Sequence, residues 1–138
     1  MIFTSFDPEE DLIIVSATVR GPHHEMRLRL AVDTAASLTL IATEVIDQIG
    51  LGARQGTART ILRSAIGEEP AYLIKVPLLQ ALGYDFPDFL VHSHDLPEAV
   101  GIDGLIGLNL RRQFNYEVRS GEGRILLNTS LRPSPSSP

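Results

Sequence analysis

Short apolar runs separated by turn residues dominate the hydrophobic pattern of the chain. Residues 25–30 (EMRLRL) alternate between charged and apolar side chains, the period of two that is typical of a half-buried strand. Another strand-like run, residues 11–18, precedes them, and Gly21 and Pro22 separate the two runs. We therefore predict a hairpin over this region.

The same arrangement of strand-like runs and turns recurs further along the chain. Additional runs are found at residues 58–66, 70–76, 78–82, 86–92, 115–118 and 124–127. Residues 67–70 (GEEP) and 120–123 (SGEG) carry turn signals between neighbouring runs, which predicts two more hairpins. We expect Gly83 to begin a loop after the run that ends at position 82.

Helical spacing is confined to two short stretches. In residues 42–50 the apolar side chains lie on one face, Thr43 is the expected N-cap and Gly50 the expected end. Residues 108–114 also place apolar side chains at roughly helical spacing. Together these elements predict a mainly β fold, a small closed or partly closed barrel with one or two short helices.

Length and composition fit one globular domain. The chain has 138 residues, of which 43% are hydrophobic and 21% charged. We assign residues 1–131 to the domain and residues 132–138 (RPSPSSP), which are too rich in proline and serine to pack, to a disordered tail.

Charge and cysteine content exclude several classes of protein. The net charge is -5 and no basic stripe is present, which argues against nucleic acid as a partner. The chain has no cysteine, so disulfides and thiolate chemistry are excluded. Residues 1–12 are acidic and lack the features of a signal peptide, and no apolar run approaches the roughly 20 residues that span a bilayer. We expect a cytoplasmic protein without a membrane partner.

Asp33 is the carboxylate with the most unusual surroundings. Apolar residues 30–32 lead into it, small and hydroxyl residues 34–37 follow, and residues 38–41 form a second largely apolar run. This pattern predicts a position at the end of a buried strand, where ionisation is costly unless hydrogen bonds or a partner compensate. Asp33 is therefore either a satisfied structural carboxylate or a catalytic one.

A single carboxylate is a poor general base at neutral pH, whereas two that share a proton can act as acid and base. Such a pair can activate a water molecule against a peptide carbonyl. The chain has one motif of this kind. A paired site would need a second copy of the chain, with the two Asp33 side chains at the axis of a two-fold dimer.

Two sequence motifs resemble those of a known family. Residues 31–37 (AVDTAAS) are similar to the active-site loop of retropepsin-like aspartic proteases, whose usual form is Asp-Thr/Ser-Gly-Ala/Ser; single-domain bacterial members are the nearest comparison. Residues 103–109 (DGLIGLN), about seventy residues later, resemble the family's second signature. The predicted hairpin over residues 58–76 falls where the family has its substrate-covering flap. The resemblance extends from about residue 11 to residue 127.

The resemblance implies a role for each matching position. Asp33 would be the catalytic carboxylate, Thr34 would hydrogen-bond across a dimer, and backbone amides would lie beside the carboxylates. The residues that support this loop are Thr34, Ala35, Ala36 and Ser37. The flap tip would be formed by Ser64, Ala65, Ile66 and Gly67. The structural motif behind the loop would be Leu105, Ile106 and Gly107, and its glycine would let the chain pass close to the loop.

The resemblance implies an aspartic endopeptidase that acts as a homodimer on peptide or protein substrates, without metal or cofactor. In one departure, Ala35 stands where the family has glycine, and its Cβ bears on activity more than on fold. The alternative is a catalytically inactive domain of this fold that serves dimerisation or peptide binding. A third possibility is an obligate monomer.

Other candidate chemistries have weaker support. The pairs His23/His24 and His92/His94 lack a third ligand at motif spacing, so we expect exposed histidines and not a metal site. We expect Asp103 to cap a turn before a glycine.

A serine nucleophile and a basic binding site are also disfavoured. Ser37 lacks the Gly-x-Ser-x-Gly pattern of a serine nucleophile. Arg111 and Arg112 are expected on a solvated helix face.

Overall fold

The alternating run at residues 25–30 lies in a strand of the predicted hairpin. The computed structural model describes residues 2–52, 58–64, 67–96, 101–128 and 134–135. In it, β2 (Ile14–Arg20) pairs antiparallel with β3 (Glu25–Val32), so the hairpin is confirmed. In β3, Leu28 and Leu30 are buried while the arginines between and beside them are exposed. The alternation of charged and apolar residues in the sequence thus corresponds to one exposed and one buried face of this strand.

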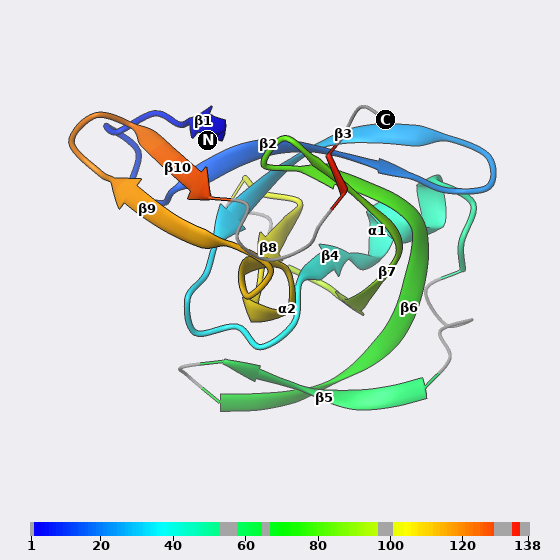
Figure 1. Ribbon diagram of the computed structural model, residues 1–138. Coiled ribbons are helices and arrows are strands. Elements are labelled where there is room, and N and C mark those ends of the chain that lie inside the picture. The colour runs from blue at the N-terminus through cyan, green and yellow to red at the C-terminus, as the bar shows by residue number, and fades with distance from the viewer. Residues whose placement is uncertain (1, 53–57, 65–66, 97–100, 129–133, 136–138) are drawn as a thin grey trace.

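Six strands close into a barrel, which confirms the predicted mainly β architecture (Figure 1). Their order around the ring is β7 (Tyr84–His94), β4 (Leu40–Ala42), β8 (Gly104–Ile106), β3, β2 and β6 (Gly67–Ala81). The ring closes because β6 pairs with β2 along one edge and with β7 along the other. Pairings of β3 with β8 and of β4 with β7 are parallel, and the others are antiparallel.

The hairpin of β6 and β7 differs from the predicted sequence of short strands and loops. Leu82 and Gly83 have φ angles of 55° and 83°, so they form a tight two-residue turn where a loop was expected. Residues 67–70, predicted to be a turn, instead begin β6 and pair with β5 (Ala58–Ser64). The Gly-Glu-Glu-Pro signal was misleading because the chain reverses just before it, between Ser64 and Gly67.

Two short helices follow strands directly. In α1 (Thr43–Gln48) the N-cap is Ala42, with an extended ψ of 140° and no side-chain cap bond, so the prediction of Thr43 is wrong. The cap is displaced because β4 runs straight into the helix. Gly50 has a φ of 95° and ends the helical region as predicted. The second helix, α2 (Leu108–Arg111), is shorter than predicted. Across the described ranges, no helix is long and apolar enough to cross a membrane.

A smaller sheet contains the chain segments near the two ends. The predicted hairpin of β9 (Asn115–Arg119) and β10 (Arg124–Asn128) is confirmed, and β1 (Ile2–Ser5), which was not predicted, pairs with β10. β11 (Ser134–Pro135) pairs with β7 through backbone atoms, where a disordered tail was expected. The other residues of that tail lie outside the described ranges.

The buried histidine of β7 is an exception to the expectation of exposed histidines. His23 and His24 are exposed, but His92 is only 1% exposed and neither of its ring nitrogens has a hydrogen-bond partner. Burial lowers the pKa of His92 below its ordinary value of 6.5, and the nearby His94 lowers it further. The described residues contain no group of three potential metal ligands around it or elsewhere.

This burial makes the stability of the fold depend on pH. Because the folded pKa of His92 is depressed, the unfolded chain binds the proton more readily. The free energy of unfolding should therefore fall as pH drops below about 6.5, by at most about 1.4 kcal/mol per pH unit for this one proton. Urea denaturation between pH 7.5 and 5 measures it. The slope should flatten in His92→Leu and persist in His24→Gln, whose histidine is exposed. Equal slopes in all three proteins would contradict this assignment.

Candidate active site

The Asp33 loop, residues 33–37, starts where β3 ends. The Asp33 amide donates to the Ile106 carbonyl at 3.2 Å, and the Ala36 amide donates to the Asp33 carbonyl at 3.2 Å. One carboxylate oxygen of Asp33 accepts the amide of Ala35 at 2.9 Å. Asp33 is partly exposed, so the expectation of a buried acid needs correction. Leu30 and Ala31 in the preceding strand are buried, whereas Val32 and Asp33 at its end are partly exposed.

Ala35 occupies the glycine position of the usual motif without backbone strain. Outside glycine, the positive φ angles in the described residues belong to Leu82 and Asp88, so Ala35 has no left-handed conformation. Its side chain is exposed. Alanine therefore fits this loop, and its Cβ meets no backbone constraint that would require glycine.

The second motif lies directly behind this loop. A Cβ added to Gly107 would overlap the backbone carbonyl group of Leu38, so only glycine allows this approach. The amide of Leu108 donates to the Ala36 carbonyl at 2.9 Å, and that of Asn109 donates to the Ser37 carbonyl at 3.1 Å. The link at Gly107 and the first residues of α2 thus hold the second half of the Asp33 loop through backbone contacts.

A polar network that sequence reasoning missed holds the same link. Thr39 is fully buried; its hydroxyl donates to the Asn109 side-chain oxygen at 2.9 Å and accepts the Gly107 amide at 3.1 Å. Asn109 also accepts the Thr39 amide at 2.8 Å and donates to the Leu90 carbonyl at 2.9 Å. The signal in the sequence was Thr39, a single hydroxyl residue within the otherwise apolar run 38–41. All these groups are satisfied, which makes the network rigid.

Both motifs fall within one match to a known family. The family model described as Aspartyl protease matches residues 15–110, which include Asp33 and the whole second motif. The chain belongs to the aspartyl protease family.

A solved structure shows the same fold. The crystal structure of a retropepsin-like aspartic protease from Rickettsia conorii aligns with a TM-score of 0.67 and 20% sequence identity, over 92% of this chain and 89% of that one. No curated protein matches the sequence. The retropepsin-like fold expected from the two motifs is thereby confirmed.

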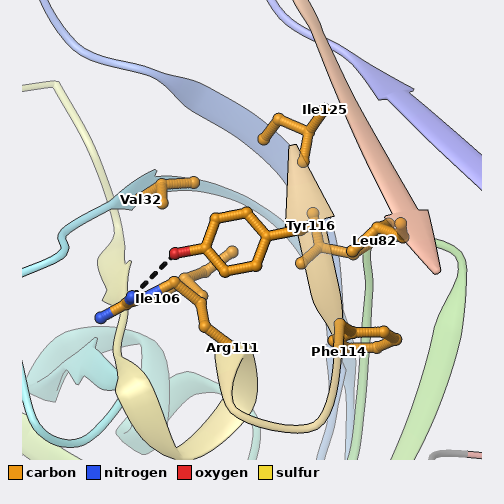
Figure 2. Close-up of a pocket in the computed structure, with 8 residues that line it drawn as sticks. Val32, Leu82, Ile106, Arg111, Phe114, Tyr116 and Ile125 are labelled. Atoms are coloured by element: carbon orange, nitrogen blue, oxygen red, sulfur yellow. Dashed lines mark hydrogen bonds between the residues drawn. The ribbon is translucent and has the colours of Figure 1, made fainter. Parts of the chain in front are cut away.

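In this member of the family, Arg111 corrects the prediction of a solvated arginine pair. Arg112 is exposed as expected, but Arg111 is buried. It lies beside a small cavity of about 10 Å³, room for one water molecule at most, which Figure 2 shows. The cavity is lined by Val32, Leu82, Ile106, Arg111, Phe114, Tyr116, Ile125 and Leu127. It is part of the interior and too small for a peptide.

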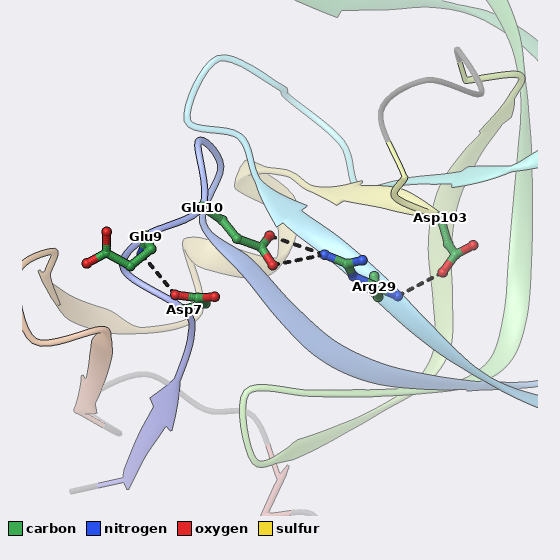
Figure 3. A network of polar contacts seen from close by, with 5 residues as sticks. All are labelled: Asp7, Glu9, Glu10, Arg29 and Asp103. Carbon is green, nitrogen blue, oxygen red and sulfur yellow. Dashed lines mark hydrogen bonds and ion pairs between the residues drawn. The ribbon is translucent and has the colours of Figure 1, made fainter.

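Asp103 has a structural role that differs from the expected turn cap. Its carboxylate accepts the Arg29 amide at 2.8 Å, and its own amide donates to the Arg29 carbonyl at 2.8 Å (Figure 3). The Arg29 side chain forms an exposed ion pair with Glu10 at 3.2 Å. Asp103 therefore extends the pairing of β3 and β8, which fixes the strand that leads to Asp33.

The residues expected to form the flap belong to the hairpin of β5 and β6 or to its tip. Ser64 and Gly67 form the last backbone pair before the chain reverses. Ala65 and Ile66, the predicted tip, lie outside the described residues. In Figure 1 this hairpin extends from the barrel on the side where the loop after β3 also lies.

The close approach at Gly107 can be tested by one added methyl group. Gly107→Ala should lower the free energy of unfolding by about 2 kcal/mol or more, because the Cβ meets backbone atoms that cannot move aside. Gly121→Ala is the matched control, since nothing lies within 4 Å of a Cβ there. Urea denaturation of the two variants gives the comparison. Equal stability would show that the loop relaxes away from the link.

Proposed function

We propose that this protein is an aspartic endopeptidase that hydrolyses peptide bonds as a homodimer, with one Asp33 from each subunit. The observation that carries the proposal is the Asp33 loop itself. Its carboxylate is accessible, its backbone is held from behind, and within the described residues it is hydrogen-bonded to no second carboxylate. One chain therefore supplies half of an acid pair.

Two such carboxylates at a two-fold axis can catalyse the hydrolysis. They cannot both ionise at close range, so one is the base and the other holds a proton. The ionised Asp33 takes a proton from water as the oxygen attacks the peptide carbonyl, while the protonated one donates to the carbonyl oxygen. Collapse of the tetrahedral intermediate breaks the C–N bond: the carboxyl group that took the proton from water gives it to the leaving amine, and the other carboxylate takes back the hydroxyl proton of the intermediate. We expect an acidic to mildly acidic activity optimum, because one acid must stay protonated.

Two exposed apolar side chains near the loop, Leu12 and Leu108, support a second copy as the partner. In the described part of the chain, the exposed large hydrophobic residues are Phe3, Leu12 and Leu108. Leu108 adjoins the loop, since its amide donates to the Ala36 carbonyl. Leu12 precedes Ile13, whose carbonyl accepts the amide of Val32 at 2.9 Å. Apolar groups beside an incomplete site are what a dimer interface would cover.

Replacing the acid by its amide tests the mechanism. Asp33→Asn should lower peptide cleavage by about 10²–10⁴-fold, because an amide can be neither the base nor the acid. Cleavage of a peptide mixture at pH 4–6 is measured by mass spectrometry, with sedimentation at micromolar protein to check the dimer. Asp88→Asn, at an exposed position of β7, is the control and should cleave normally. Unchanged cleavage in Asp33→Asn would rule the mechanism out, and a monomer would rule out the pair.

Ala35 is the residue that tests the second candidate function, an inactive domain of this fold that binds peptides or dimerises. The backbone at Ala35 does not need glycine, so we expect Ala35→Gly to change the cleavage rate by no more than about threefold. The same peptide assay, run on the parent protein and on Ala35→Gly, distinguishes the two candidate functions. An inactive parent protein that gains cleavage in Ala35→Gly would favour the binding function.

A further inference from the structure

Arg111 is a buried cation directly behind the loop that carries Asp33. The residue is 6% exposed. Nη1 donates to the Tyr116 hydroxyl at 2.9 Å, and Nη2 donates to the Asp33 backbone carbonyl at 3.2 Å. Figure 2 shows the side chain extending from α2 to the Tyr116 hydroxyl, with Val32 and Ile106 beside it. One guanidinium thus joins α2, β9 and the Asp33 loop.

No acid neutralises this cation in the described part of the chain. The ion pairs found there involve Arg20, Arg29 and Arg119, all of them exposed. The Nε of Arg111 has no hydrogen-bond partner. Burying a charge without a counter-ion is costly, and an apolar side chain would fill such a space more stably. Fold stability alone therefore does not account for arginine at this position.

We propose that Arg111 is a positioning residue that holds Asp33 in place for the reaction, an inference that rests on the function proposed above. The Asp33 carbonyl accepts two hydrogen bonds, one from Arg111 and one from the Ala36 amide. Together they fix the peptide plane after Asp33, and with it the direction in which the Asp33 side chain projects from the backbone. The planar guanidinium suits this task because its donors are held in a rigid fork.

Steady-state kinetics separate positioning from substrate binding. Arg111→Met keeps an unbranched side chain about as long as the aliphatic part of arginine, but removes the charge and both donors. We expect kcat to fall roughly 10–100-fold with KM changed by no more than about twofold, because the reacting acids lose alignment while the surface that meets substrate stays intact. Arg112→Met is the matched control: the same substitution one residue away, at an exposed position, with wild-type kcat expected.

Amide hydrogen exchange tests the inference without relying on cleavage. The Ala36 amide should exchange about tenfold faster or more in Arg111→Met, since its acceptor is no longer held from behind. Amides that pair β9 with β10 should keep their rates. A parent protein without peptidase activity would overturn the proposed function, while the exchange rate of Ala36 would still decide the role of Arg111.

Two outcomes would overturn the inference. One is a wild-type exchange rate for Ala36 in Arg111→Met; the other is equal acceleration of amides throughout the barrel, which would show a general stabilising role. Should Arg111→Met fail to fold, Arg111→Lys keeps the charge but not the rigid fork. It should show intermediate kcat and intermediate exchange of Ala36, and wild-type values for both would contradict a need for the guanidinium.

Discussion

The backbone contact between Gly107 and the segment at Leu38 and Thr39 is the constraint on which the candidate site depends. A Cβ at Gly107 would overlap main-chain atoms of that segment, so the two stretches of backbone are in direct contact with no side chain between them. This contact places β8 between β3 and β4, and it lets the first residues of α2 donate to the Asp33 loop. The loop is held from behind by rigid elements, which leaves its outer side free.

Polar groups buried behind the loop make the arrangement specific. The Thr39 and Asn109 network is fully satisfied, so it costs little and sets one geometry. Arg111 is different. Its charge has no acidic partner in the described residues, and its Nε has no hydrogen-bond partner there. A fold tolerates such a group where it contributes something besides stability. In this fold, Arg111 contributes a hydrogen bond to the Asp33 carbonyl.

Regular local patterns were predictable, and exceptions arose where tertiary contacts outweighed them. The alternation in β3 and the Gly-rich turn before β10 gave hairpins that the structure contains. The turn at Leu82 and Gly83 was missed because its first residue is an apolar one that rarely adopts a positive φ. β1 was missed because it is short and gains its hydrogen bonds only by pairing with β10, more than a hundred residues away.

The sequence by itself determined the family, the barrel and the place of Asp33, because two short motifs at the right separation and one buried face per strand are local properties. Only the tertiary structure decided the environment of individual polar groups. It showed Asp33 partly exposed, His92 and Arg111 buried, and Asp103 joined to β3. Burial and hydrogen bonding depend on which distant strands pack together, and a residue's neighbours along the chain do not record that.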